Sequence, residues 1–180
     1  MTRIVAVEYL SLDGVMEEPG WSGPYFNDEV ATFQMNNLFG ADALLLGRVT
    51  YDGFRAAWPS MEGDEAGFGE RMNSLPKYVA TTSTSQPEWN ATFLRGDIAE
   101  AVAALKATAD DTLLLNGSAD LFRLLSAHNL IDEYRFMIYP VVVGLGKRLF
   151  ADGAVPIDLK LTSSLITQSG VAILTYVPAD

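Results

Sequence analysis

Residues 112–119 read TLLLNGSA, and this stretch decides the fold class of the chain. Three consecutive leucines after Thr112 have the length and apolarity of a strand buried on both faces, and the small polar run 116–118 then interrupts it. From Ala119 to Asn129, apolar residues recur at helical spacing. The stretch therefore predicts a strand, a tight turn and a helix.

The turn 116–118 is a candidate ligand site. Small residues let the backbone approach a ligand closely, and the following helix points its free N–H groups to the same place, which suits an anionic cofactor. An ordinary strand-to-helix connection explains these residues equally well, because the GxGxxG spacing of a dinucleotide-binding turn is missing. Other stretches have to decide between the two.

Composition excludes several classes of protein. A chain of 180 residues is expected to form one domain, 1–180, with a real core. The net charge of -11, with 12 basic against 23 acidic residues, argues against nucleic-acid binding, so any phosphate has to be held locally.

Cysteine is absent, which removes disulfides, thiolate nucleophiles and cysteine-based zinc sites. The single His128 cannot form a histidine metal cluster, and its place near a helix end indicates a surface or capping role, so no metal site is expected. No signal peptide or membrane-spanning run is recognisable. We expect a soluble cytoplasmic protein.

Strands and helices alternate along the chain. Strand patterns cover Arg3–Ser11, Ala43–Leu46, Lys77–Ala80, Thr92–Leu94 and Glu133–Val143, and helices follow the first, second and fourth of these and the TLLL strand. This alternation predicts a mainly parallel sheet with helices on both faces and a ligand site at the carboxyl ends of the strands. The last segments, Leu159–Ile166 and Val171–Val177, predict an antiparallel hairpin that completes the sheet.

Two further strand ends carry phosphate-binding chemistry. The strand Ala43–Leu46 runs into Gly47, Arg48 and Thr50, which place a small residue, a positive charge and a hydroxyl at a helix start. The strand Lys77–Ala80 ends in five successive hydroxyl residues, 81–85. They are interpreted either as plain loop chemistry or as donors to a phosphate.

Two carboxylates are candidates for a catalytic role. Asp13 follows the first strand at its carboxyl end, where it either bonds nearby backbone N–H groups or faces the site. Glu29 lies in the first turn of a helix capped by Asn27, where the helix dipole alone would explain it.

Three loop features border the predicted site. The segment Glu17–Pro24 is long enough to form a flap, and the glycine-rich loop 144–148 carries two cations that either cradle an anion or close a turn. Trp21, Phe54 and Trp58 are candidate aromatic walls, although core packing is the commoner role of such side chains.

The order of motifs carries a family resemblance. SLDG, GRVTY, KYVATTS, LLLNGSADLFRLL and YPVVVGLGKRLF follow one another over nearly the whole chain, and PxxxGxGxxLF covers Pro140–Phe150. In this order the chain resembles the dihydrofolate reductase-like superfamily. Within it, the chain is most similar to the reductase domain of the bifunctional riboflavin-biosynthesis deaminase/reductase and its stand-alone relatives.

The resemblance implies an α/β fold with three layers, helix, sheet and helix (αβα). Its sheet is expected to be mixed and mainly parallel, with about eight strands and the C-terminal antiparallel hairpin. It also implies an NADPH-dependent reductase that transfers a hydride to a small pyrimidine- or pterin-like heterocycle. The implied cofactor-binding residues come from three turns: Gly47, Arg48 and Thr50; Thr81, Thr82 and Ser83; and Asn116, Gly117, Ser118, Ala119 and Leu121. The family relationship further implies a homodimer.

The chain also departs from the family pattern. Asn116 replaces the first glycine of a Gly-Gly turn, and asparagine tolerates unusual backbone angles there better than most residues. Glu29 matches the pterin-binding acid only loosely, and the zinc motifs of the deaminase domain are missing, so reduction without deamination is expected. Asp13 is the carboxylate we expect to matter for turnover.

Two other function classes stay open at this point. One is a non-catalytic nucleotide- or flavin-binding protein of the same fold, and the other is an interaction module whose cleft is vestigial. Arg48, the hydroxyl run and the NGSA turn argue against a vestigial cleft.

Overall fold

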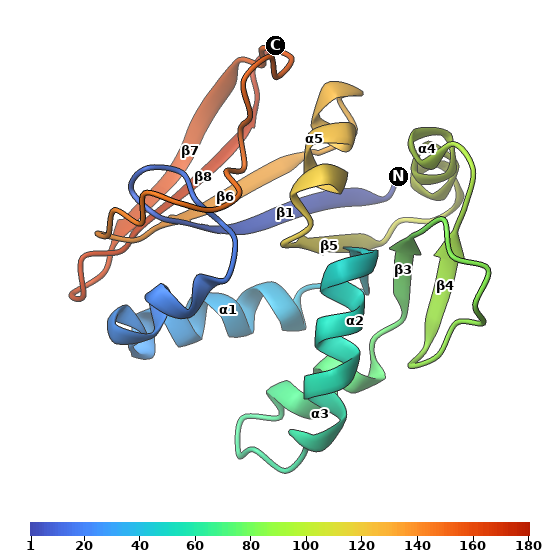
Figure 1. Cartoon of the computed structure of the whole chain (residues 1–180), viewed down its shortest axis with the longest axis horizontal. Coiled ribbons are helices and arrows are strands. Elements are labelled where there is room, and N and C mark those ends of the chain that lie inside the picture. The colour runs from blue at the N-terminus through green and yellow to red at the C-terminus, as the bar shows by residue number, and fades with distance from the viewer.

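The computed structural model describes residues 1–180 and contains one eight-stranded sheet (Figure 1). The strands are β1 (Arg3–Leu10), β2 (Ala43–Gly47), β3 (Lys77–Ala80), β4 (Ala91–Leu94), β5 (Thr112–Asn116), β6 (Glu133–Ile138), β7 (Leu159–Ile166) and β8 (Ala172–Pro178). The α-helices are α1 (Asp28–Phe39), α2 (Arg48–Ala57), α3 (Phe68–Ser74), α4 (Ile98–Thr108) and α5 (Ala119–Ala127), and the short 3-10 helices are η1 (Pro19–Tyr25) and η2 (Trp58–Ser60).

The strand order is β4-β3-β2-β5-β1-β6-β8-β7. All pairs from β4 to β6 are parallel, while β8 runs antiparallel to both β6 and β7. The predicted mixed, mainly parallel sheet with a C-terminal hairpin is therefore confirmed.

Two apolar layers fill the space between the sheet and its helices. The alternate residues Val5 and Val7 of β1 face α1, α2 and α3, whereas Ile4 and Ala6 face α4 and α5. Figure 1 shows α1, α2 and α3 on one side of the sheet and α5 on the other. The three expected layers, helix on sheet on helix, are present.

The last helix and the strand before it follow the TLLLNGSA stretch closely. β5 covers Thr112–Asn116 and α5 begins at Ala119, as predicted. The strand expected over Glu133–Val143 is shorter, because β6 ends at Ile138 and Pro140, which has no N–H to donate, follows shortly after.

A difference in strand length opens the sheet on one side of β1. Asn116, the last residue of β5, pairs with Val7, but β1 continues to Leu10 with only β6 beside it. The edge of β1 from Glu8 onward is therefore free on the β5 side. This gap lies at the carboxyl ends of the parallel strands, where α/β sheets bind their ligands.

Local signals set the boundaries of the first helix. Asn27 Oδ1 accepts a hydrogen bond of 3.0 Å from the Val30 N–H and so caps α1, as the sequence predicts. The expected flap 17–24 contains the 3-10 helix η1 rather than an open loop. No helix of the chain has the length and apolarity needed to cross a membrane.

Candidate functional site

A cleft of about 1360 Å³ lies at the carboxyl ends of the parallel strands. Its lining includes all but one of the residues that the sequence assigned to cofactor binding, namely Gly47, Arg48, Thr50, Thr81, Thr82, Asn116, Gly117, Ser118, Ala119 and Leu121. The exception is Ser83. The fold thus brings three turns, far apart in sequence, to one place.

Ser118 joins the turn before α2 to the turn before α5. Its Oγ accepts a hydrogen bond of 2.8 Å from the Gly47 N–H and donates one of 2.8 Å to Thr50 Oγ1. One hydroxyl therefore fixes the spacing of two helix starts. The serine of the NGSA turn positions the backbone and has no free donor left for a ligand.

The approach of these two turns explains the small residues. A Cβ on Gly117 would lie 3.2 Å from Thr50 Oγ1, and one on Gly47 would lie 3.1 Å from both Ser118 Cβ and Oγ. Gly117 and Ser118 also adopt left-handed φ angles of 57° and 61°. The sequence placed the unusual backbone angle at Asn116, but Asn116 is the last residue of β5 and the angle falls on its two successors.

Both helix starts leave backbone donors free. α2 begins after Gly47 and α5 after Ser118, and neither N-terminus carries a side-chain cap. Uncapped N-termini present unpaired N–H groups and the positive end of the helix dipole. Two such ends on one cleft form a suitable cradle for a pair of linked phosphates.

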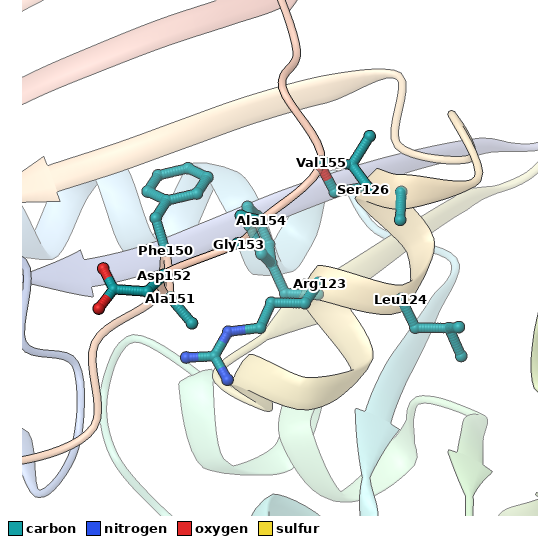
Figure 2. Close-up of a pocket in the computed structure, with 11 residues that line it drawn as sticks. Arg123, Leu124, Ser126, Phe150, Ala151, Asp152, Gly153, Ala154 and Val155 are labelled. Carbon is teal, nitrogen blue, oxygen red and sulfur yellow. The ribbon is translucent and has the colours of Figure 1, made fainter.

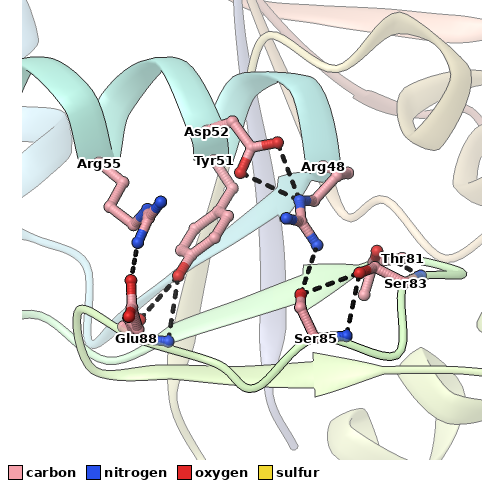
Figure 3. Close-up of polar contacts among 8 residues, drawn as sticks. All are labelled: Arg48, Tyr51, Asp52, Arg55, Thr81, Ser83, Ser85 and Glu88. Atoms are coloured by element: carbon pink, nitrogen blue, oxygen red, sulfur yellow. Dashed lines mark hydrogen bonds and ion pairs between the residues drawn. The ribbon is translucent and has the colours of Figure 1, made fainter.

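Arg48 connects the start of α2 to the hydroxyl run (Figure 3). Its Nε donates to both carboxylate oxygens of Asp52, at 3.0 and 2.9 Å, and its Nη1 donates to Ser85 Oγ at 3.3 Å. Ser83 does not contact Arg48 directly but hydrogen-bonds to Ser85, with their hydroxyl oxygens 2.8 Å apart. Asp52 holds the Arg48 guanidinium through Nε, so Nη1 of the same group is directed at the hydroxyl run.

A second arginine at this place is missing from the sequence prediction. Arg95 donates from Nε to the Ser83 carbonyl at 2.9 Å and from Nη2 to the Ser85 carbonyl at 3.0 Å. It follows β4 directly and precedes Gly96. The signal was available, because a cation at the carboxyl end of a strand is the same pattern that singled out Arg48.

Asp13 does not line the cleft. Its carboxylate accepts hydrogen bonds from Ser11 Oγ at 2.6 Å and from the N–H groups of Val143 and Gly144 at 3.1 and 2.8 Å. These bonds, that of Ser11 foremost, lower the pKa of Asp13 to about 2. Asp13 is thus an ionised anchor for the loop after β6. It bonds backbone N–H groups, as one of the two interpretations held, but these belong to residues 143 and 144 and not to its own turn.

Glu29 does not line the cleft either. Its Oε2 accepts from the Gln168 N–H at 2.7 Å and from Asn27 Nδ2 at 3.2 Å. The side chain therefore ties the start of α1 to the turn between β7 and β8. Neither carboxylate proposed from the sequence as catalytic points into the cavity.

Glu8 is the buried carboxylate that lines the cleft. It is 1% exposed, and its Oε1 has no hydrogen-bond partner. Burial raises the pKa of Glu8 well above its ordinary value, and a backbone hydrogen bond from Gly117 opposes this only in part. The sequence signal was a single acid inside an otherwise apolar strand.

Of the three aromatic residues proposed as cleft walls, two line the cleft and one packs against another aromatic ring. Phe54 and Trp58 line the cleft, whereas Trp21 packs edge-on against Tyr139, with ring centroids 5.6 Å apart. The flap contributes its first residues, Glu17 to Pro19, to the lining.

The two cations of the loop 144–148 are both paired. Lys147 Nζ lies 2.8 Å from Asp120 Oδ2, and Arg148 lies 3.6 Å from Asp13 Oδ2. The Lys147 N–H donates to Glu17 Oε2 at 3.0 Å. The loop therefore closes against carboxylates, and only Lys147 reaches the cleft.

A smaller cavity of about 330 Å³ lies between α5 and the segment 150–155 (Figure 2). Phe150 packs against Phe122, with ring centroids 5.7 Å apart, and Arg123 Nε donates to the Leu149 carbonyl at 2.8 Å. The polar groups around it hold the segment in place. The large cleft is consequently the candidate active site.

An eight-stranded mixed sheet in this strand order, with a cleft at the carboxyl ends of its parallel strands, is the dihydrofolate reductase-like fold. The family model described as the RibD C-terminal domain matches residues 3–173. The chain belongs to this family, which is of the reductase type.

Relatives and solved structures agree with this assignment. The uncharacterized protein YyaP of Bacillus subtilis (strain 168) is 32% identical over 137 residues, which cover 75% of this chain and 73% of YyaP. A putative riboflavin biosynthesis protein from Shewanella sp. PV-4 is 22% identical, covers 99% of both chains and has a TM-score of 0.79.

Two more distant structures share the fold. Dihydrofolate reductase from Enterococcus faecalis, complexed with NADP(H) and RAB-propyl, has a TM-score of 0.68 at 13% identity over 99% of this chain and 97% of that one. The Thermotoga maritima diaminohydroxyphosphoribosylaminopyrimidine deaminase/5-amino-6-(5-phosphoribosylamino)uracil reductase has a TM-score of 0.70 at 16% identity. The match covers 99% of this chain but 57% of the Thermotoga protein.

Proposed function

We propose that the protein is an NADPH-dependent reductase that transfers a hydride to a small heterocyclic compound. The observation that carries this proposal is the pair of uncapped helix starts, α2 and α5, joined by Ser118 at the edge of the large cleft. Two adjacent N-termini supply backbone donors for a pyrophosphate without any basic cluster. This matters in a chain with a net charge of -11.

The residues of the cleft fit the cofactor. Gly47 and Gly117 leave room for close backbone approach, and the N–H groups that open α2 and α5 would hold the linked phosphates. Arg48 and Arg95, with the hydroxyls of Thr82 and Ser85 close by, would hold a 2′-phosphate. NADPH would supply the hydride, so the protein has to bind and orient the cofactor and the substrate and to exclude water.

Glu8 is the group we assign to proton supply, in place of Asp13. Burial raises the pKa of Glu8 and so favours its protonated form, which is the state a general acid needs. Asp13, with a pKa of about 2, is ionised throughout that range and is engaged by the loop after β6. Glu8 also lies next to Gly117, at the centre of the cleft lining.

The comparisons support the proposal at the level of class. The family is one of reductase domains, and the Enterococcus faecalis structure of the same fold was solved with NADP(H). Neither names the substrate of this chain.

Equilibrium titration with NADPH, NADH and FMN tests the function directly. We expect saturable binding of NADPH at one site per chain, weaker binding of NADH, and consumption of NADPH only when an acceptor is added. Tight FMN binding without NADPH binding would favour a flavin-binding protein instead. Binding of none of the three at millimolar concentration would favour the interaction module with a vestigial cleft.

A further inference from the structure

One region of the cleft is lined by apolar and uncharged polar side chains. Its walls come from β1, α1, α2 and the segment after α2, and they include Tyr9, Phe26, Gln34, Met35, Phe54 and Trp58. We call this region the apolar half of the cleft. Aromatic and thioether side chains of this kind bind the faces of flat rings.

None of the six side chains that define the apolar half is charged. The cations of the cleft, Arg48 and Lys147, both lie on the side of the two turns and are paired with Asp52 and Asp120. A phosphate group in the apolar half would lose its water without gaining a cation, in a protein whose net charge already repels it.

Tyr9 offers the polar contact in this region. Gln34 Nε2 donates to the Tyr9 hydroxyl at 2.7 Å, and Gln34 Oε1 accepts from Asn37 Nδ2 at 3.1 Å. These two bonds fix the orientation of the Gln34 amide, so the Tyr9 oxygen acts as the acceptor between Tyr9 and Gln34. The hydroxyl proton of Tyr9 is left to donate to an acceptor such as a ring carbonyl.

We infer that the substrate is an uncharged, flat ring compound that carries a carbonyl oxygen at its edge and no phosphate. Its faces would pack between Phe54, Trp58 and Met35, and its carbonyl would accept the Tyr9 proton. This inference rests on the proposed function, because it takes the ligand of the apolar half to be the compound that is reduced. It separates this chain from the Thermotoga maritima enzyme, whose name describes a phosphoribosylated substrate.

A matched pair of probes tests the inference. Riboflavin and FMN share one flat, carbonyl-bearing ring and differ by a phosphate. Their dissociation constants are measured by fluorescence on protein saturated with NADP⁺, so that the two turns cannot hold the FMN phosphate. We expect riboflavin to bind at least tenfold more tightly than FMN.

Two variants sharpen the test. Met35→Arg places a cation in the apolar half and should raise FMN affinity at least fivefold relative to riboflavin. Tyr9→Phe should weaken riboflavin about fivefold, the value of one neutral hydrogen bond, and leave NADP⁺ affinity unchanged. Phe39→Ala, on the same helix as Met35 but outside the cleft, is the matched control and should change neither.

The outcomes separate this inference from the proposed function. FMN binding as tight as riboflavin binding on the NADP⁺-loaded protein would overturn the inference, and so would absence of riboflavin binding while NADP⁺ binds. If NADP⁺ fails to bind and riboflavin is still preferred tenfold over FMN, the inference stands and the proposed cofactor is wrong.

Discussion

At the scale of single residues, Arg48 and Arg95 are the positive charges that a 2′-phosphate would meet. Both guanidinium groups reach the loop 83–85, Arg48 through the Ser85 hydroxyl and Arg95 through two carbonyls. In a strongly acidic chain, this local compensation is what would distinguish NADPH from NADH.

We predict that Arg48→Ala weakens NADPH binding by about 1 to 3 kcal/mol, the value of a lost charge-assisted hydrogen bond, and NADH binding much less. Calorimetric titration of both cofactors measures the difference. Arg3→Ala is the matched control, because it removes the same charge and its partner Glu133 keeps an ion pair with Arg135. Equal losses for the two cofactors would place Arg48 at the shared pyrophosphate.

Glu8 makes a prediction about stability and pH. Its pKa is raised in the folded state by burial, so at pH values above the ordinary pKa near 4.5 the ionised form of this group disfavours folding. Below its ordinary pKa, near 4.5, both states are protonated and the cost disappears.

Glu8→Gln should therefore be more stable than the wild type at pH 7, and this gain should vanish at pH 4. Urea unfolding at the two pH values measures it, with the exposed Glu65→Gln as control. A gain of the same size at both pH values would mean that packing, and not ionisation, causes it.

Sequence reasoning located most of the cleft lining but missed the residues that need tertiary context. Gly47, Arg48 and the NGSA turn follow strands directly, so local pattern identifies them. Glu8 was missed because its meaning depends on where β5 ends relative to β1, which no local pattern encodes. Asp13 and Glu29 were overvalued because their backbone partners, 143–144 and 168, are far away in sequence.

At the scale of elements, the loop after β6 depends on Asp13. This loop borders the cleft through Lys147, while the Asp13 carboxylate accepts the N–H groups of Val143 and Gly144. The pKa of Asp13 is lowered to about 2, so its contribution to stability is present above the ordinary pKa near 4 and is lost as the pH falls toward 2.

We predict that Asp13→Asn lowers the thermal midpoint at pH 7, with a difference that shrinks between pH 4 and pH 2. NADPH affinity should stay within about twofold, because Asp13 does not line the cleft. Thermal unfolding across this pH range measures it, and Asp152→Asn, an exposed charge on the nearby segment, is the control. A tenfold loss of turnover with unchanged NADPH affinity and unchanged stability would instead give Asp13 the catalytic role that the sequence alone suggested.

Element boundaries were predictable where a residue has a local mechanism. Asn27 caps α1 through its side-chain oxygen, and this helix start was predicted. The end of β6 and the 3-10 turn η1 were not, because the apolar run 141–143 continues the strand pattern although its backbone leaves the sheet.

At the scale of the whole molecule, strand and helix alternation was enough to predict the parallel sheet and its terminal hairpin. The order of the strands was not predicted from periodicity, since it depends on which helix covers which face. The family resemblance supplied the three layers and the number of strands, about eight, but not their order.

The sheet ends in an exposed apolar edge, which bears on assembly. β7 is the last strand, and its Leu161, Leu165 and Ile166 are 50%, 45% and 65% exposed. Free sheet edges with apolar side chains pair readily with another chain. We predict a two-fold symmetric dimer through this side.

Light scattering at micromolar concentration should give twice the chain mass, and Ile166→Glu should shift the protein toward the monomer. Met61→Lys changes an apolar residue of similar exposure, 51%, away from this edge and should leave the dimer intact. A monomeric mass for the unmodified protein would exclude this assembly.

The most direct test of the central claim is amide chemical-shift mapping with NADPH on the ¹⁵N-labelled protein. We predict that the largest shifts fall on the turns 47–50 and 116–119 and on Thr81 and Thr82, which line the cleft together. Shifts confined to the segment 150–155, or no shift at millimolar NADPH, would contradict it.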